Sequence, residues 1–370
     1  MIVYIAEKNN GMKKIVIACD SYKGCLTSKE VNENLAQAFL HQDTQSDAPQ
    51  IITLQMSDGG EGMLDAYLSA MGGERIKMLA HDALMRWISA EYGVANLSHD
   101  TLFQDKERGN MPVAIIEIAQ TAGLHLIETE QRNPMKATSW GVGEMVMHAY
   151  HQGIRHFIVG LGGSATSDCG IGMLKAMGDD WKKVRNDCHF VLASDVTNPL
   201  YGVNGAAHVF APQKGANADM VEMLDARARR FAEISAKHFS YDMSQTSGAG
   251  AAGGLGYAFL QYFHAEFHSG ADLLLDALCF DQLIADADLV VTGEGHSDHQ
   301  TLMGKLPMRI LEHTRKSHSP IWLVSGGISH REELLAAGFD KVVAVTPEDM
   351  PLEEAMKPEV AKRLLRQLKI

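Results

Sequence analysis

The sequence has few cysteines, and none of them lies in a metal-binding or redox pattern. Its 370 residues include five cysteines, with no C-x-x-C pair and no cysteine–histidine cluster at zinc-finger spacing. An odd number of cysteines in a long chain is typical of reduced thiols, so we expect a cytoplasmic protein. The amino terminus has no basic region followed by an apolar stretch, which predicts no secretory signal. Residues 1–11 are polar and irregular, and Met12 is a candidate alternative start.

Positive charge and long apolar runs are also scarce. The chain has 33 Lys and Arg against 46 Asp and Glu, a net charge of −13, which argues against a nucleic-acid partner. No apolar run reaches the length of a membrane span. A hydrophobic content of 46% indicates a globular protein, and the sequence does not indicate an oligomeric state. An anionic substrate would need local positive charge from lysines and helix amino termini.

Two familiar catalytic patterns are missing. The sequence contains no P-loop G-x-x-x-x-G-K-[ST] and no G-x-S-x-G serine elbow. A literal G-x-G-x-x-G occurs within "GAGAAGGLG", but it follows a polar segment instead of a strand, so a dinucleotide site is disfavoured. Gly248 and Gly250 of this stretch either let a helix pack against another backbone or bring a helix amino terminus to an anion.

The order of apolar segments predicts an α/β fold with two domains. "IVIAC" and "IITLQM" lack polar alternation and are separated by a segment with helical spacing, which is typical of a parallel sheet covered on both faces. The carboxyl-terminal part repeats this alternation. We therefore predict a discontinuous, Rossmann-like, doubly wound domain at 1–72 plus 282–370, and an inserted mixed α/β domain at 73–281. Within the latter, "AAHVFAP" is predicted to be a strand.

Polar loops follow three strands of the predicted outer sheet. "ACDSYKG" supplies Asp20, Ser21 and Lys23, and "MSDGGEG" supplies Asp58. Ligands of open parallel sheets bind beyond the carboxyl ends of the strands, so these side chains could converge on a phosphate, a magnesium ion or a substrate hydroxyl. The alternative is that each acid only caps a helix.

The third of these loops is "VVTGEGHSDHQTLMGK". It carries Gly293, Glu294, Asp298 and Lys305 directly after an apolar strand. The two histidines that flank Asp298 lack a third ligand, so a histidine metal site is disfavoured. Asp298 is better suited to magnesium or a ribose.

A glycine-rich loop opens in the predicted inserted domain. "HFIVGLGGSATSDCG" places Gly162 and Gly163 after a strand and Ser164 and Thr166 before a helix. Consecutive N–H groups in such a loop hold an anion without a side chain. The alternative is a tight turn capped by Ser167 or Asp168.

Two further loops of that domain carry candidate residues. "ASDVTNPLYG" contains Asp195 and Asn198, which suit an acid and its positioning amide, although a plain turn is equally compatible. Lys214 in "APQKGA" is a candidate phosphate clamp.

Taken together, these motifs resemble the type-1 glycerate kinases, and they occur in that family's order from about Lys13 to the last predicted strand. The resemblance implies ATP-dependent, Mg²⁺-dependent phosphorylation of D-glycerate, with 2-phosphoglycerate favoured, in glycolate, glyoxylate or glucarate breakdown. It also implies a cleft between two α/β domains. The chain departs from the family at Cys19, where proline is usual, at His296, where arginine is usual, and in "SATSDCG".

The resemblance and the loops lead to the following assignments. We expect catalytic roles for Asp195, Asp58 and Lys23, magnesium ligation by Asp20 and Asp298, glycerate binding by Ser21, Asn198, Gly248 and Gly250, and nucleotide or phosphate binding by Gly162, Gly163, Ser164, Thr166, Lys214, Gly293 and Glu294. The alternatives are a kinase that forms 3-phosphoglycerate or acts on another small hydroxy acid, and a non-catalytic sugar-acid sensor.

Overall fold

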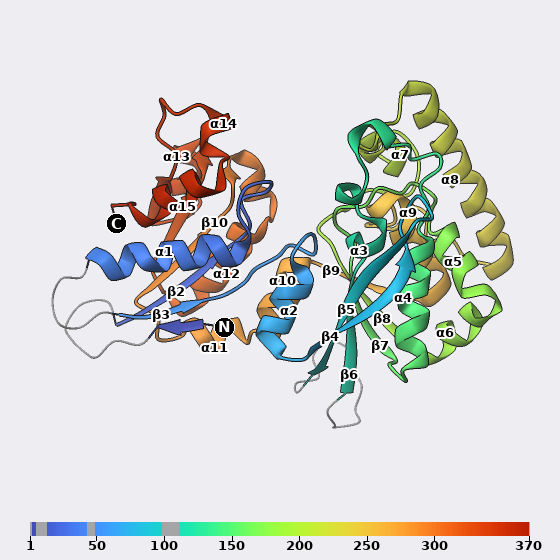
Figure 1. Ribbon diagram of the computed structural model, residues 1–370, viewed down its shortest axis with the longest axis horizontal. Coiled ribbons are helices and arrows are strands. Elements are labelled where there is room, and N and C mark those ends of the chain that lie inside the picture. Colours follow the sequence, from blue (N-terminus) through green and yellow to red (C-terminus); the bar gives the residue numbers. More distant parts are fainter. Residues whose placement is uncertain (1, 5–12, 43–48, 98–110, 370) are drawn as a thin grey trace. The chain divides into compact units, whose positions relative to one another are not determined.

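The computed structural model describes residues 2–4, 13–42, 49–97 and 111–369, and these residues divide into two compact units (Figure 1). Unit 1 comprises Met1–Asp58, Asp65–Ala70 and Ala271–Ile370, and unit 2 comprises Gly59–Leu64 and Met71–Gly270. Helix α2 (Met63–Met71) contains residues of both units. The boundaries expected from the sequence, 72/73 and 281/282, lie near these divisions and stay a prediction about domains.

The sheet of unit 1 is parallel except at one edge. Its order is β1-β3-β2-β10-β12-β14, from strands β1 (Ile2–Tyr4), β2 (Lys14–Cys19), β3 (Gln50–Thr53), β10 (Leu289–Gly293), β12 (Ile321–Ser325) and β14 (Lys341–Ala344). The antiparallel strand is β1, which pairs with β3. Residues 2–4 therefore form a strand, whereas the sequence predicted irregular structure there. Without β1, the strands in chain order lie 2-1-3-4-5, which is a doubly wound order with its switch point between β2 and β10.

Helices cover both faces of this sheet, which explains the uninterrupted apolar strands. Ile15 and Ile17 of β2 pack with Leu35 of α1 (Ser28–Gln42) and Leu365 of α15 (Pro358–Arg366). Val16 lies on the opposite face by strand alternation and is equally buried. The other helices of the unit are α10 (Gly270–Ala277), α11 (Phe280–Ile284), α12 (Leu306–Ser317), α13 (Arg331–Ala336) and α14 (Leu352–Ala355). A short parallel pair, β11 (His296–Ser297) with β13 (Gly327–Ile328), lies beyond the strand ends.

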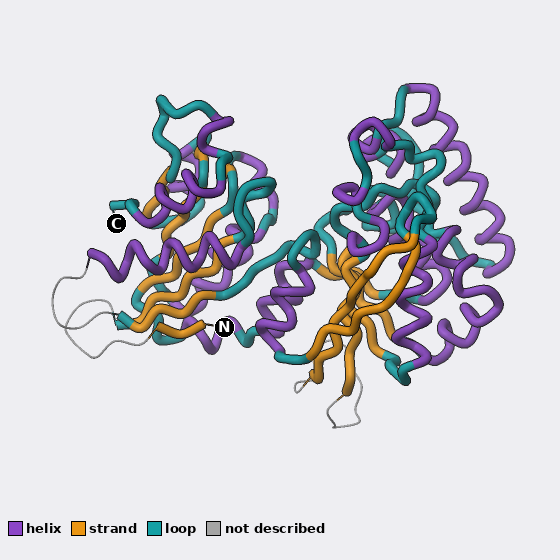
Figure 2. Tube along the Cα trace, viewed as in Figure 1, coloured by secondary structure: helices purple, strands orange, loops and turns teal. Residues whose placement is uncertain are grey.

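The sheet of unit 2 is mixed, as predicted, and its strands are drawn in orange in Figure 2. Its strands follow chain order and are β4 (Glu74–His81), β5 (Trp87–Leu97), β6 (Met111–Glu117), β7 (His156–Gly160), β8 (His189–Ala193) and β9 (Glu266–His268). Pairing is antiparallel from β4 to β6 and parallel from β6 to β9. The helices are α3 (Ala119–Ala122), α4 (Trp140–His151), α5 (Ile171–Met177), α6 (Trp181–Asp187), α7 (Ala206–Phe210), α8 (Ala218–Phe239) and α9 (Ala251–Phe263).

The strand predicted for "AAHVFAP" is wrong, because residues 206–210 form helix α7. Ala207 and Ala211 pack against Val221 and Leu224 of α8. In a short apolar run, periodicity does not distinguish a buried strand from a buried helical turn. Here the packing against α8 determines that the segment is helical. Among the described residues, no helix is long and apolar enough to cross a membrane.

Candidate active site

The ends of β2 and β10 bring two carboxylates together at the switch point of the unit 1 sheet. Cys19 of β2 lies opposite Gly293 of β10, and the Asp20 N–H donates to the Gly293 carbonyl at 2.8 Å. Asp20 and Glu294 therefore follow neighbouring strand ends. Gly293 is required for close packing, because a Cβ there would stand 1.6 Å from the Val324 carbonyl oxygen.

A buried amide that the sequence analysis missed holds the strand ends in place. Asn32 of α1 accepts from the Cys19 N–H at 2.9 Å and donates to the Leu54 carbonyl at 2.7 Å. Ser28 donates to the Cys19 carbonyl at 2.6 Å and accepts from the Met56 N–H. Asn32 is 1% exposed, and its position on the buried face of an amphipathic helix was the available signal.

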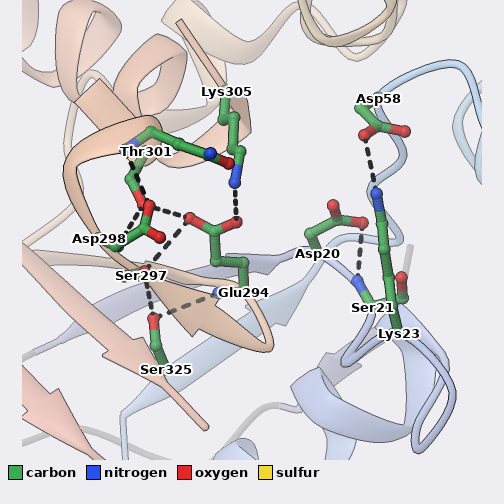
Figure 3. Close-up of polar contacts among 11 residues, drawn as sticks. Asp20, Ser21, Lys23, Asp58, Glu294, Ser297, Asp298, Thr301, Lys305 and Ser325 are labelled. Carbon is green, nitrogen blue, oxygen red and sulfur yellow. Dashed lines mark hydrogen bonds and ion pairs between the residues drawn. The ribbon is translucent and has the colours of Figure 1, made fainter. Parts of the chain in front are cut away.

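Lys23 and Asp58 form an ion pair beside Asp20 (Figure 3). The Lys23 Nζ lies 3.3 Å from Asp58 Oδ2, and the Lys23 side chain is 75% exposed. The Asp58 charge raises the pKa of Lys23. Burial, and then the Asp58 charge, raise the pKa of Asp20 to about 7, although the Ser21 N–H donates to its carboxylate at 2.7 Å. The loop therefore places the charged Lys23 ammonium next to Asp20, whose negative charge is only weakly stabilised.

Glu294 is fixed by hydroxyl groups from the loop that follows it. Thr301 donates to Glu294 Oε1 at 2.6 Å and Ser297 at 3.3 Å, while the Lys305 ammonium lies 3.5 Å from Oε2 (Figure 3). Asp298 is used differently: its side chain accepts from the Gln300 N–H at 2.8 Å and caps the short helix His299–Met303. Its assignment as a magnesium ligand stays a prediction, and this capping role accounts for an acid at the position.

These charged groups line a cavity of about 460 Å³ in unit 1. Asp20, Ser21, Lys23, Asp58, Glu294 and Lys305 all contribute to its wall. The loops after β2, β3 and β10 thus converge on one cavity, as the sequence predicted. Three carboxylates and two lysines around one cavity suit the binding of a phosphorylated ligand together with a cation.

The carboxylates of the cavity fit a magnesium ion only in partnership with a ligand. In the described part of the chain, no three carboxylate, imidazole or thiol groups are placed to share a metal. Magnesium is commonly held by one or two carboxylates together with substrate phosphates. Burial raises the pKa of Asp20 most, and the charges of Asp58 and Glu294 raise it further, so a bound cation would relieve this repulsion.

The loop after β7 needs a glycine at position 162, because another backbone segment of unit 2 packs closely against it. A Cβ on Gly162 would stand 2.3 Å from the Gly60 Cα, and the Gly162 N–H donates to the Gly59 carbonyl. Gly163 has φ +69°, and a Cβ there would meet the Ala119 Cβ at 3.5 Å, an ordinary contact distance. The sequence analysis predicted either an anion-binding loop or a tight turn here. In this structure the "DGGEG" backbone approaches Gly162, and the positive φ of Gly163 fits the tight turn, while anion binding stays a prediction.

Lys214 lies beneath this loop and is buried. Its side chain is 2% exposed, and its Nζ donates to Ser164 Oγ at 2.8 Å and to the Thr166 carbonyl at 2.7 Å. Burial lowers the pKa of Lys214 to about 7, against a weaker opposing effect of the Asp168 charge. The hydroxyls of Thr166 and Ser167 are buried without a hydrogen-bond partner. Lys214 thus fastens the loop from inside.

Asp168 organises the helices that begin around the loop. Its carboxylate accepts from the N–H groups of Ser139, Gly170 and Gly172 at 2.9–3.1 Å and from the Ser139 hydroxyl at 2.9 Å. Asp168 therefore ties the start of α4 to the start of α5, which corresponds to the capping alternative raised for it.

The remaining candidates of unit 2 lie around the start of α9. Asn198 donates through its side chain to the Asn204 carbonyl at 2.8 Å and accepts at its backbone oxygen from the Gly250 N–H at 2.9 Å. A Cβ on Gly250 would stand 2.3 Å from the Pro199 carbonyl oxygen, and one on Gly248 would meet the Phe267 ring at 2.5 Å. Close packing thus explains both glycines, against backbone at Gly250 and against a side-chain ring at Gly248, and their assignment to the substrate stays a prediction. Asp195 follows β8 and is exposed.

Glu117 is a second buried polar group that the sequence analysis missed. It ends β6, is 4% exposed, and accepts from the Leu64 N–H at 3.3 Å in the first turn of α2. Burial raises the pKa of Glu117 to about 7. Glu117 is the one acid in an otherwise apolar strand, and this position in the sequence could have indicated a buried carboxyl group.

The fold and the polar cavity at the switch point define an α/β protein with a charged cavity suited to a small anionic ligand. Comparisons with known proteins make this specific. The sequence is 34% identical to a glycerate kinase of Bacillus subtilis, over 93% of each chain, and 33% identical to the glycerate 2-kinase of Escherichia coli, also over 93% of each. The crystal structure of a candidate glycerate kinase 2 from Salmonella typhimurium LT2 superposes with a TM-score of 0.76 at 34% identity, over 96% of each chain.

The profile of the Glycerate kinase family matches residues 15–183 and 179–369. The chain therefore belongs to the glycerate kinase family and is a kinase. The resemblance inferred from the motifs is confirmed at the level of the family.

Proposed function

We propose that the protein transfers the γ-phosphoryl group of ATP to D-glycerate and forms 2-phosphoglycerate. The observation that carries this proposal is the convergence of Lys23, Lys305 and three carboxylates on one cavity at the sheet's switch point. Relatives named glycerate kinase and glycerate 2-kinase support the acceptor and the position of transfer. A role in glycolate, glyoxylate or glucarate breakdown is the context in which such an activity would serve.

The charged side chains of the cavity have separable tasks in this proposal. Phosphoryl transfer depends on positioning and on stabilising negative charge, with little covalent chemistry from the protein. Lys23 and Lys305 neutralise phosphate oxygens, and Asp20 with Glu294 would hold the magnesium ion. That ion would supply positive charge to offset the negative charge that develops during transfer.

The glycerate hydroxyl needs a carboxylate to orient it and to accept its proton. Asp195 and Asp58 are the two candidates, and each follows a strand of its own unit. Aspartate-to-asparagine substitution keeps the shape of the side chain and removes the charge, so it separates a proton acceptor from a structural acid. We expect Asp195→Asn to reduce turnover by about 100-fold or more while ADP affinity stays unchanged. Near-normal turnover in Asp195→Asn would transfer the role to Asp58.

The decisive test is the chemical identity of the product. The protein is incubated with D-glycerate and Mg-ATP, and the product is assigned by phosphorus NMR against authentic 2- and 3-phosphoglycerate. A 2-phosphoglycerate signal supports the proposal. A 3-phosphoglycerate signal moves the site of transfer, and ATP consumption only with another hydroxy acid changes the acceptor. Binding of glycerate without any phosphorylated product would favour a sensor.

A further inference from the structure

The unit 1 cavity has an apolar part that the proposed phosphoryl chemistry does not use. Its charged part comes from the ends of β2 and β10 and their loops. The apolar part comes from the carboxyl-terminal segment and is lined by Val345, Met350, Leu352, Ala355, Met356, Ala361 and Leu364. Thr346 is the one polar side chain that this segment adds to the described lining.

The apolar part adjoins the lysine loop directly. The Met356 Cε lies 3.5 Å from the position that a Cβ on Gly24 would occupy, and Gly24 is the neighbour of Lys23 in the chain. A ligand whose phosphates meet Lys23 would therefore extend over Met356. Leu352 and Met356 expose 75% and 38% of their surface, so their apolar groups are available to such a ligand.

The chemistry of these side chains suits a flat aromatic ring. Methionine is flexible, and its polarisable thioether makes favourable contacts with aromatic rings. Ligand sites of 300–1,000 Å³ typically combine an apolar wall with a few placed polar groups. The cavity has a volume of about 460 Å³ and carries two lysines in its charged part, so it fits this description. Its volume is larger than a three-carbon acid would fill.

We propose that the base of the nucleoside triphosphate lies against Met350, Met356 and Leu364, with its phosphates directed to Lys23 and Lys305. This inference rests on the proposed function in one respect, that the phosphoryl donor is a nucleotide. It assigns the nucleotide to unit 1 and makes the carboxyl-terminal segment its base-binding wall. Base recognition then comes from apolar contact and shape, because the segment adds a single polar side chain, Thr346, to the described cavity wall.

The test fills the apolar part while leaving the charged part intact. Met356→Trp adds bulk there, and Met223→Trp on α8 is the matched control, since Met223 is 50% exposed and does not line the cavity. Isothermal titration with ADP and with pyrophosphate, both with Mg²⁺, separates the base from the phosphates. We expect Met356→Trp to weaken ADP binding roughly tenfold or more and to leave pyrophosphate binding within about twofold of wild type. Met223→Trp should change neither.

Equal effects of Met356→Trp on ADP and pyrophosphate, or no effect on either, would overturn the inference. Met350→Trp, in a surface loop, repeats the test if circular dichroism shows that the first variant is unfolded. A change in self-association on sedimentation, with ADP affinity intact, would also overturn it, because a second copy would then cover these side chains. Wild-type product formation is scored separately: formation of phosphoglycerate with unaffected ADP binding leaves the proposed function standing and removes only the base site.

Discussion

Lys23 and Lys214 look interchangeable in the sequence, since both lie in glycine-containing loops after apolar segments, yet the structure gives them opposite environments. Lys23 is 75% exposed beside Asp58, which raises its pKa. Lys214 is 2% exposed, and burial lowers its pKa to about 7. An exposed, charged ammonium is available to a phosphate. A buried ammonium with both hydrogen bonds directed at a loop is a structural fastener.

The counterpart of Lys214 in unit 1 is therefore Asn32, not Lys23. Asn32 is a buried amide that holds the ends of β2 and β3 from below, as Lys214 holds the loop after β7. In both units, a buried polar side chain thus fixes the backbone of a loop. Substitutions at such buried groups and at the exposed Lys23 test whether the first act on stability and the second on activity.

The largest expected effect is on turnover. Lys23→Met keeps an unbranched side chain of nearly the same length and removes its charge, so we expect kcat to fall about 100- to 1,000-fold, as for loss of one charge-stabilising donor. Because Lys23 is exposed, the thermal midpoint should stay near that of wild type. Lys214→Met should show the reverse order, with a lower midpoint and a smaller loss of turnover. Coupled ADP-release kinetics and calorimetry on both variants measure this.

The next effect concerns the buried amide of unit 1. Asn32→Ala leaves the Cys19 N–H and the Leu54 carbonyl without this partner in a buried setting, and each such group costs about 1–3 kcal/mol. Denaturant unfolding should show a loss within that range or above it. Gln37→Ala, on the same helix, is the control, because Gln37 is only half-buried. A loss no greater than that of the control would mean that the strand ends do not depend on Asn32.

A smaller effect separates the two glycines of the unit 2 loop. Gly162→Ala places a methyl group against the Gly60 backbone, so the "DGGEG" segment must move, at a cost of about 1–3 kcal/mol. Gly163→Ala meets only Ala119 Cβ at 3.5 Å but has φ +69°, which costs about 1 kcal/mol. Comparing the free energies of unfolding of the two variants checks this order. The reverse order would contradict the packing explanation.

The last effect is a pH dependence from Lys214. Its folded-state pKa of about 7 lies below the unfolded value near 10.5, so between these values the unfolded chain binds more protons and the contribution of Lys214 to stability rises with pH. The stability difference between wild type and Lys214→Met should thus grow in favour of wild type from pH 7 to pH 9, by at most roughly 1.4 kcal/mol per pH unit. The neutral amine keeps two N–H donors for Ser164 and Thr166. A difference that is constant with pH would mean that Lys214 is charged throughout.

The sequence predicted the parts of this molecule that follow from strand ends. Asp20, Lys23, Asp58 and Glu294 meet because carboxyl ends of parallel strands share one edge, and that rule needs only the apolar runs. It could not predict burial: Lys214 and Lys23 have similar local patterns, and only tertiary packing separates them. For the same reason the partner of Gly162, a backbone segment about a hundred positions away in the chain, had no local signal. The helix at 206–210 was missed because its packing on α8 overrides an ambiguous apolar run.

The separation of the two lysines is tested most directly by ADP affinity. Isothermal titration of Mg-ADP into wild type, Lys23→Met and Lys214→Met, below the unfolding temperature of each, reports binding without turnover. We predict that Lys23→Met loses affinity for ADP and that Lys214→Met keeps most of it. Loss of ADP affinity in Lys214→Met with full affinity in Lys23→Met would contradict the assignment of the phosphates to the unit 1 cavity.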